Sequence, residues 1–346
     1  MSKENLFGKT LNELKDICSE LKLPGFTAKQ ISEWLYKKEI STIDEMTNIS
    51  KKNRELLSVG FQVGLIPSIK VDESTDGTKK YLFPAKGKNF IETAMIPDKD
   101  RKTICVSSQV GCKMGCLFCM TARQGFQNNL TAGEIVNQYR SIDEFQDISN
   151  IVYMGMGEPF DNLDEVLKSI EILTADWGYA MSPRRITVST IGIIPAMKTF
   201  LENSEAHLAV SMHTPFDEER KALMPVESVY ALKDVVNEIK SFDFGLQRRV
   251  SFEYIMFKGV NDTPAHVDEL VKLLKGVRCR INLIRFHPIP DSTLVGSDDQ
   301  TILKFKETLN DKGILTTIRA SRGEDIFAAC GLLSTKELVK SQEEDY

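Results

Sequence analysis

From Lys102 onward, β-like runs alternate with helical patterns, and this alternation constrains the fold more than any other feature of the chain. The strand candidates are TICVSSQV, NIVYMGM, RITVST, HLAVSMH, RVSFEYIMF, RINLIRF and LTTIRAS. Helical patterns begin near Thr131, Asn162, Ile194, Ala231, Pro264 and Asp299. Because such alternation builds a parallel sheet, we expect an α/β fold. A partial (β/α)6 barrel is favoured over a doubly wound sheet, with the chemistry at the carboxyl ends of the strands in either case.

The chain before Lys102 divides into two parts. In LNELKDICSELKLPGF, apolar residues recur at the spacing of one helical face, which places Cys18 in a core, and Pro24-Gly25 ends the helix. Residues 61–100 carry Gly and Asp-Gly turn signals around short β-like runs. We therefore expect four segments, which are a helical domain (1–60), a β-rich linker (61–100), the barrel (101–333) and a polar carboxyl-terminal tail (334–346).

Capping-box signatures predict three helix starts. They pair Thr27 with Gln30, Thr131 with Glu134, and Asn162 with Glu165.

Composition excludes several classes of protein. With 346 residues, 42% of them hydrophobic and 27% charged, the chain is typical of a globular protein. No apolar run approaches the ~20 residues of a membrane helix, and the first residues lack the apolar core of a secretory signal, so we expect a cytoplasmic protein without membrane contact. The net charge of −5 argues against indiscriminate binding of polyanions. It leaves room for a local basic channel, and basic clusters occur in KKNR, KK, SPRR and QRR.

Three of the seven cysteines lie in CKMGCLFC, residues 112–119. Gly111, Lys113 and Gly115 make this a poor core segment, and a zinc site would need a fourth ligand at a spacing that is missing. An iron-sulfur cluster held by three thiolates fits better, although zinc and redox roles remain alternatives. Such a cluster leaves one iron open to bind S-adenosylmethionine and pass an electron to its sulfonium.

The pattern C-x3-C-x2-C, with Phe118 before the last cysteine, resembles the radical S-adenosylmethionine (SAM) superfamily. In that superfamily the cysteine loop follows the first strand of a partial barrel, and here it follows TICVSSQV. The resemblance implies a [4Fe-4S] cluster on Cys112, Cys116 and Cys119.

Three further motifs end predicted strands and fit the same cofactor. MGMGEP resembles the superfamily's Gly-Glu motif, in which Gly157 lets a ligand approach and Glu158 accepts hydrogen bonds from its amino group. STIG offers Ser189, and SMH offers Ser211, Met212 and His213, for ribose and carboxylate contacts.

Cys105 and Cys330 taken singly are ordinary core residues. Together with ICVSSQVGC, FCMTARQGFQNNLTAGEI, MGMGEPFDN, LMPVE, FEYIMFKGVND and SRGEDIFAACG, they resemble the family of dual-specificity ribosomal and transfer RNA adenine methyltransferases, from about Glu92 to Gly331. GFTAKQISEWLY is similar to that family's small helical domain, which we expect to dock RNA. One departure is His287 in RFHP, where the family usually has Asn. Histidine can still make one hydrogen bond to the cofactor.

The resemblance implies methylation of carbon 2 of one adenine in 23S rRNA, in the peptidyl transferase region, and of the adenine 3′ of the anticodon in tRNAs. The same resemblance implies that two SAM molecules are used per turnover. By this analogy we expect Cys330 to take a methyl group from the first, and a radical from the second to activate that group to add to the adenine. Cys105 is then expected to release the adduct by forming a disulfide with Cys330, and Glu92 to accept the ring proton. The expected partners are 23S rRNA, tRNA and a reducing donor such as flavodoxin, with a monomer as the working unit.

Two other functions remain open for this chain. The first is that of a related enzyme, which methylates carbon 8 of the same rRNA adenine; it shares the five functional cysteines, so the cysteines do not distinguish the two. The second is that of a non-catalytic iron-sulfur RNA-binding protein, although such a protein would not need Cys105 and Cys330. Cys279 matches no family role and is expected to be structural. In each catalytic case the target base must be presented unpaired, as an extruded base.

Overall fold

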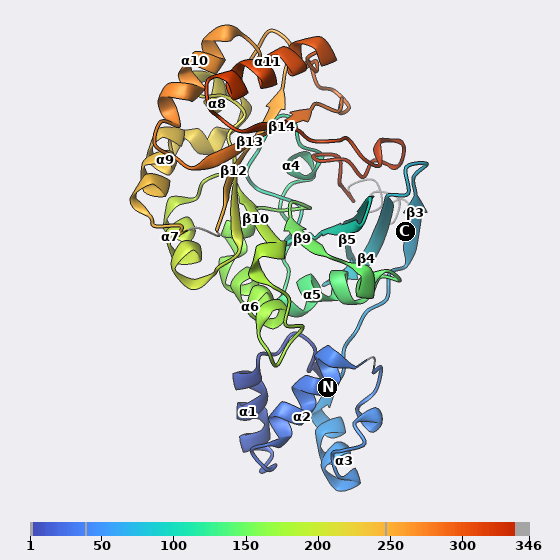
Figure 1. Cartoon of the computed structure of the whole chain (residues 1–346). Coiled ribbons are helices and arrows are strands. Elements are labelled where there is room, and N and C mark those ends of the chain that lie inside the picture. Colours follow the sequence, from blue (N-terminus) through green and yellow to red (C-terminus); the bar gives the residue numbers. More distant parts are fainter. Residues whose placement is uncertain (1–2, 39, 246–247, 336–346) are drawn as a thin grey trace.

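One ten-stranded sheet forms the centre of the computed structural model, which describes residues 3–38, 40–245 and 248–335 (Figure 1). Its strand order is β14-β13-β12-β11-β10-β9-β6-β5-β4-β3. The strands are β3 (Lys70–Glu73), β4 (Lys79–Ala85), β5 (Asn89–Asp98), β6 (Arg101–Cys105), β9 (Asn150–Tyr153), β10 (Ile186–Thr190), β11 (His207–Ser211), β12 (Val250–Met256), β13 (Cys279–Arg285) and β14 (Thr316–Ile318).

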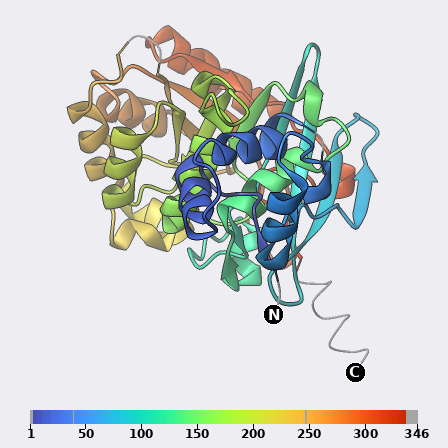
Figure 2. The same ribbon diagram turned by 90° about the horizontal axis from the view of Figure 1, so that it is seen from below.

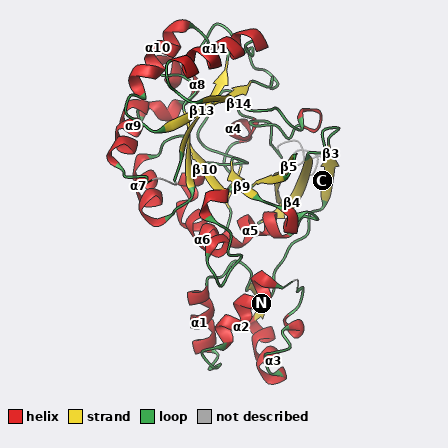
Figure 3. Cartoon of the chain, viewed as in Figure 1, coloured by secondary structure: helices red, strands yellow, loops and turns green. Residues whose placement is uncertain are grey.

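Within this sheet, β6 and β9 to β14 are all parallel and follow one another in chain order, while β7 (Gln109–Val110) and β8 (Asn128–Asn129) form a separate antiparallel pair. Helices lie outside the curved sheet (Figure 3). They include α5 (Ala132–Arg140), α6 (Leu163–Thr174), α7 (Ile194–Asn203), α9 (Leu232–Ser241), α10 (Pro264–Leu273) and α11 (Asp299–Asp311). A doubly wound sheet would reverse its strand order at a switch point, which this sheet does not do. The predicted partial barrel is therefore confirmed, with a seventh parallel strand at its edge.

The strands of the predicted linker extend the barrel sheet. β3, β4 and β5 pair antiparallel, and β5 pairs antiparallel with β6, with Ala94 opposite Cys105. The turn between β5 and β6 is tight and contains Lys99, whose φ is +51°. Because a tight turn joins β5 to the first barrel strand, the hairpin continues the sheet and brings β5 beside Cys105.

The amino-terminal helices form a separate body below the barrel (Figures 1 and 2). They are α1 (Leu11–Glu20), α2 (Thr27–Lys37) and α3 (Lys51–Gly60), with a short parallel pair of β1 (Glu4–Asn5) and β2 (Phe61–Gln62). Cys18 is buried in their core, as predicted. The two bodies meet where Gly8 (φ +93°) crosses α5, since a Cβ at Gly8 would lie 2.3 Å from the Gly133 Cα. The Tyr36 ring packs against Trp177 and Tyr179 beside this crossing.

The capping predictions had mixed outcomes. Thr131 and Glu134 form the predicted capping box at α5. The box predicted at Thr27 is wrong, because Thr27 is already the first residue of α2. α6 begins after Asn162 as expected, but no capping box forms there. The Asn162 amide donates instead to the carbonyls of Ser108 and Leu130, and so ties α6 to the loop after β6.

The end of the described chain is packed against the sheet. The Thr335 hydroxyl donates to the Phe90 carbonyl, and the Thr335 amide donates to Gln124. Residues 336–346 of the predicted tail lie outside the described residues. Within the described ranges, no helix is both long and apolar enough to cross a membrane.

A buried arginine joins the ends of two barrel strands. Arg220 on α8 (Asp217–Leu223) is fully buried and is ion-paired with Glu227. Its guanidinium also donates to the carbonyls of Ile191 (2.7 Å), Ser211 (3.0 Å) and Met212 (3.2 Å). These carbonyls follow β10 and end β11, so one side chain fixes the relative position of both strand ends.

We predict that Arg220→Met destabilises the protein by about 3–5 kcal/mol, because it leaves the Glu227 carboxylate buried without its cation. Lys272→Met is the matched control, since it removes an exposed partner of Glu269 and should cost about 0–1 kcal/mol. Urea unfolding measures both changes. A cost below 1 kcal/mol for Arg220→Met would contradict the structural role.

Candidate active site

A cavity of about 630 Å³ opens at the carboxyl ends of the barrel strands. The predicted site residues that line it are Cys105, Cys112, Cys116, Cys119, Gly157, Glu158, Ser189, Ser211, His213, His287 and Cys330. Glu92 and Met212 are not among the lining residues. Thus the fold brings together residues from seven segments of the sequence in one place.

The cysteine loop is shaped by two glycines. Gly111 and Gly115 both have φ +71°, which disfavours other residues. A Cβ at Gly111 would lie only 1.7 Å from the Gly125 carbonyl oxygen, so the loop must cross that carbonyl without a side chain. The turn places Cys112 and Cys116 in buried positions, with Cys119 directly before α4 (Met120–Gln124).

The three thiols form one group suited to soft metal chemistry. Burial is the largest cause of the raised pKa of all three thiols, and the neighbouring Cys112 and Cys119 raise the pKa of Cys116 further. Among the described residues, no three His, Cys, Asp or Glu side chains converge closely enough to hold a single metal ion. The irons of a cluster each take one thiolate, so a cluster needs a wider arrangement than one ion does. Three free thiols on one short loop are the soft donor set that an iron-sulfur cluster takes, so the loop fits such a cluster.

Glu158 also lines the cavity, close enough to the cysteine loop to raise the pKa of Cys112 and Cys116. Its carboxylate accepts hydrogen bonds from the backbone N–H groups of Phe160 (3.1 Å) and Ile191 (3.0 Å). Burial raises the pKa of Glu158 to about 7, although these N–H groups favour the charged form. Gly157 before it has φ +99°, and a Cβ there would lie 2.5 Å from the Gln109 Cβ. This backbone aims a carboxylate with spare acceptor positions at the cavity.

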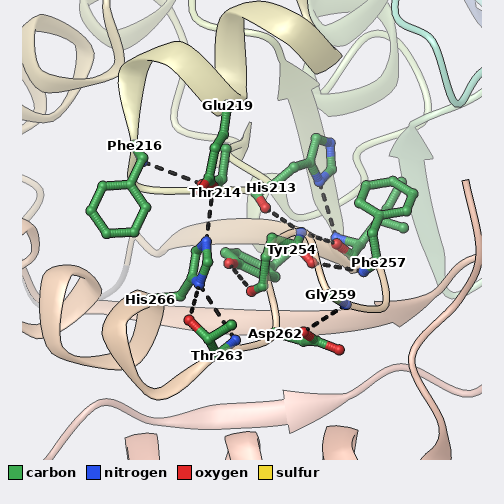
Figure 4. A network of polar contacts seen from close by, with 12 residues as sticks. His213, Thr214, Phe216, Glu219, Tyr254, Phe257, Gly259, Asp262, Thr263 and His266 are labelled. Atoms are coloured by element: carbon green, nitrogen blue, oxygen red, sulfur yellow. Dashed lines mark hydrogen bonds and ion pairs between the residues drawn. The ribbon is translucent and has the colours of Figure 1, made fainter.

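His213 follows β11, and a polar network that involves β12 and the loop after it holds its ring in one tautomer (Figure 4). Its Nδ1 accepts a hydrogen bond from the Ile255 backbone (3.0 Å), and its carbonyl accepts one from the Asn261 amide (2.6 Å). These contacts stabilise the left-handed backbone of His213, whose φ is +61°. Burial lowers the pKa of His213 to about 3, so the ring is neutral. Because Nδ1 is an acceptor, Nε2 carries the proton and can donate to a ligand.

The remaining predicted cofactor residues differ in position. Ser189 and Ser211 line the cavity from β10 and β11. Met212 does not line the cavity, since its side chain is fully buried in the hydrophobic core, and its predicted contact with the cofactor stays a prediction. His287 lines the cavity 3.7 Å from Glu324, and burial lowers its pKa. Its ring can therefore offer the single hydrogen bond expected of it.

Cys105 and Cys330 both line the cavity and lie close enough for one thiol to affect the pKa of the other. Cys105 ends β6 and packs with Ala94 and Ala328. Burial, and then the neighbouring Cys330 thiol, raise the pKa of Cys105 to about 12. Cys330 also lies close enough to Cys119 to raise the pKa of that thiol. Cys330 is thus positioned between the cysteine loop and Cys105.

Glu92 lies in the middle of β5, beneath the carboxyl-terminal segment. One carboxylate oxygen is 3.0 Å from the Lys80 ammonium, and the other accepts a hydrogen bond from the Ser334 backbone N–H (2.9 Å). Burial raises the pKa of Glu92. Its carboxylate is therefore tied to the segment that carries Cys330, next to the cavity rather than in its wall.

Two lining residues were missed from the sequence. Glu253 projects from β12, and Arg319 follows β14. The Arg319 guanidinium lies 3.2 Å from the Met154 sulfur and 3.9 Å from a Glu253 oxygen. Neither stands in a motif: Glu253 lies in the middle of its strand, and Arg319 directly follows β14.

The partial barrel, the three-cysteine loop on its first strand and the Gly-Glu motif define a radical SAM protein. Comparisons with known proteins agree, since the profile of the Radical SAM superfamily matches residues 106–274. A solved radical SAM methyltransferase from Sphaerobacter thermophilus is 37% identical, with a TM-score of 0.89 over 95% of this chain and 99% of that chain.

The sequence relatives show to which family of radical SAM proteins the chain belongs. The profile of the ribosomal RNA large subunit methyltransferase N-terminal domain matches residues 4–63. Probable dual-specificity RNA methyltransferases RlmN from Phocaeicola vulgatus and Parabacteroides distasonis are 54% and 55% identical, over 98% of this chain and 97% and 99% of theirs. The dual-specificity RNA methyltransferase RlmN of Syntrophus aciditrophicus is 42% identical over 98% of both chains. The chain belongs to the RlmN family of dual-specificity RNA methyltransferases.

We predict that Gly157→Ala weakens SAM binding about tenfold, because strain and the clash with Gln109 displace Glu158. Gly259→Ala is the matched control, since its φ is also positive (+69°) but no atom lies within 4 Å of the added Cβ. Equilibrium dialysis with labelled SAM measures both variants. Wild-type affinity in Gly157→Ala would show that the Gly-Glu backbone does not position the ligand.

Proposed function

We propose that this enzyme methylates carbon 2 of an adenine in 23S rRNA and of the adenine 3′ of the anticodon in tRNAs. The observation that carries the proposal is the meeting of Cys105 and Cys330 in one cavity with the cysteine loop. An ordinary methyl transfer to nitrogen or oxygen needs no such pair. Carbon 2 of adenine has no lone pair to attack a sulfonium, so the methyl carbon has to be carried on a protein sulfur and activated there.

The cofactor side of the cavity is built from residues that can hold the implied groups. Cys112, Cys116 and Cys119 would hold a [4Fe-4S] cluster. Glu158 would accept hydrogen bonds from the amino group of SAM, and the side chains of Ser189, Ser211, His213 and His287 would orient the rest of the molecule. When bound, the cluster and two SAM molecules per turnover supply the methyl group and an organic radical.

The protein's own thiols do the remaining chemistry. Cys330 receives the methyl group and, after loss of one hydrogen atom, carries its carbon to the adenine. After this addition the ring gives up its carbon-2 proton and one electron, for which the cluster, when bound, would be the acceptor. Cys105 then attacks the Cys330 sulfur as a thiolate. A disulfide forms, the sulfur–carbon bond breaks, and the electron pair of that bond stays on the carbon, which takes up a proton to become the methyl group.

Glu92 is proposed as the acceptor of the ring proton. Its contact with the Ser334 N–H occupies one carboxylate oxygen, and that contact joins it to the segment carrying Cys330. We propose that this contact opens when the adduct forms, which frees the oxygen for the proton. Burial raises the pKa of Glu92, which makes its carboxylate a better proton acceptor than an exposed one.

The two alternatives are less well supported. A non-catalytic RNA-binding protein would have no use for the paired thiols, and the relatives are named as methyltransferases. An enzyme acting on carbon 8 would use the same five cysteines, but the relatives carry the name of the dual-specificity enzyme.

The amino-terminal helices are proposed to dock RNA. Exposed lysines lie on α2 and α3, and they are Lys29, Lys37, Lys51 and Lys52. The matched family profile for this region is that of a ribosomal RNA methyltransferase domain. Lysines on a separate body could contact phosphates while the target base enters the cavity.

Other features of the proposal rest on the family resemblance. They are a reducing protein such as flavodoxin as electron donor, a monomer as the working unit and a location in the cytoplasm.

We predict that Cys105→Ala accumulates enzyme covalently joined to RNA through Cys330. The steps before release need only Cys330, so the adduct forms but cannot be resolved. Denaturing gels with labelled tRNA would show the joined band, and Cys105→Ala combined with Cys330→Ala should not produce it.

Cys279→Ala is the matched control, since Cys279 is a half-buried strand cysteine away from the cavity. It should give neither a band nor a loss of turnover. If Cys105→Ala methylates RNA at the normal rate with no joined band, Cys105 is only a core residue.

A further inference from the structure

We propose that Glu253 and Arg319 form the subsite that recognises the target adenine. In this subsite the free Glu253 oxygen accepts a hydrogen bond from the exocyclic amino group, and Arg319 donates one to N1. The inference rests on the proposed function and adds the two side chains that read the base.

The first observation is an unused oxygen on a buried carboxylate. Glu253 is 4% exposed. Its Oε1 accepts hydrogen bonds from the Ser251 hydroxyl (3.0 Å) and the Asn282 amide (2.7 Å). Its Oε2 has no hydrogen-bond partner among the described residues, although Glu253 lines the cavity. A buried carboxylate oxygen left without a donor is costly, so a donor from a bound ligand would complete the site.

The second observation is a guanidinium placed beside that oxygen. Arg319 reaches Met154 across the cavity, and its nearest nitrogen is 3.9 Å from the free Glu253 oxygen. That separation is too long for a hydrogen bond. The Glu253 oxygen is therefore a hydrogen-bond acceptor and the Arg319 guanidinium a donor, and the two lie side by side in the wall of the cavity.

This pair matches one edge of adenine. Adenine carries an amino donor next to the N1 acceptor, and extruded bases are read by hydrogen bonds to this edge. Hypoxanthine, the deaminated base, presents a carbonyl and an N–H there, and its carbonyl would face the Glu253 carboxylate. The pair therefore selects adenine over its deaminated form.

The position of the pair favours the target base over the adenine of SAM. Arg319 lies close enough to both Cys330 and Cys105 for the thiols to affect its electrostatics. Carbon 2 is bonded to N1, so a base held through N1 at Arg319 brings carbon 2 to the sulfur that carries the methyl group. A cation at N1 would also stabilise negative charge that the ring gains as a carbon adds to carbon 2.

The experiment compares bases at the target position. Full-length reconstituted enzyme is given tRNA carrying adenine, purine (which lacks the amino group), hypoxanthine or 7-deazaadenine at that position. Both kcat/KM and the RNA dissociation constant are measured for each. The wild type should favour adenine over purine about ten- to a hundredfold, because a charged acceptor loses its donor.

Variants at Glu253 should change this ratio. In Glu253→Ala the preference for adenine over purine should fall to about threefold or less. In Glu253→Gln, which keeps the size of the side chain, discrimination against hypoxanthine should fall, because an amide can donate to the carbonyl. Glu238→Gln, at a half-buried residue of α9 that is paired with Lys198, is the matched control and should keep both ratios.

Three results would overturn the inference. The first is unchanged base ratios in both Glu253 variants. The second is a shift in SAM affinity without a change in base ratios, which would assign Glu253 to the cofactor. The third is a large loss with 7-deazaadenine, which would place Arg319 at N7. Wild-type enzyme that methylates no adenine would count against the proposed function, and the dissociation constants would still test the subsite.

Discussion

The buried guanidinium of Arg220 holds the carbonyls of Ile191, Ser211 and Met212 together at the carboxyl ends of β10 and β11. In a parallel sheet the strands hydrogen-bond to one another, but the carbonyl groups just past the strand ends have no partner in the sheet. Here the Arg220 guanidinium, whose charge is balanced by Glu227, donates hydrogen bonds to these carbonyls. As a result Ser189, Ser211 and His213 can face inward on a rigid edge, and the cavity stays open for ligands.

The same edge carries the two halves of the proposed chemistry. The cysteine loop and Glu158 form the side where SAM would bind, and Cys105 lies on β6 at the other side. Cys330 arrives from the carboxyl-terminal segment, which is fastened to α4 by the Met120 N–H to Gly331 carbonyl bond (2.8 Å). This segment places the Cys330 sulfur near both Cys105 and Cys119 of the cysteine loop, as the proposed chemistry requires.

Sequence reasoning predicted the repeating elements well and the local contacts less well. Every predicted barrel strand is present, because alternating β and helical patterns leave few other folds. The capping box at Thr131 formed, but Asn162 used its amide to bind distant carbonyls instead. The meeting of Cys105 with Cys330 was expected from family resemblance alone. Glu253 and Arg319 carry no motif, since their pairing depends on how far the sheet curves.

The carbon that receives the methyl group tests the central claim most directly. The full chain would be expressed in a bacterium lacking its own adenine carbon-2 methyltransferase, and nucleosides from its 23S rRNA and tRNA would be analysed by mass spectrometry against synthetic standards. The account predicts 2-methyladenosine in both RNAs. Detection of 8-methyladenosine, or of no methylated adenosine with cluster-loaded enzyme, would contradict it.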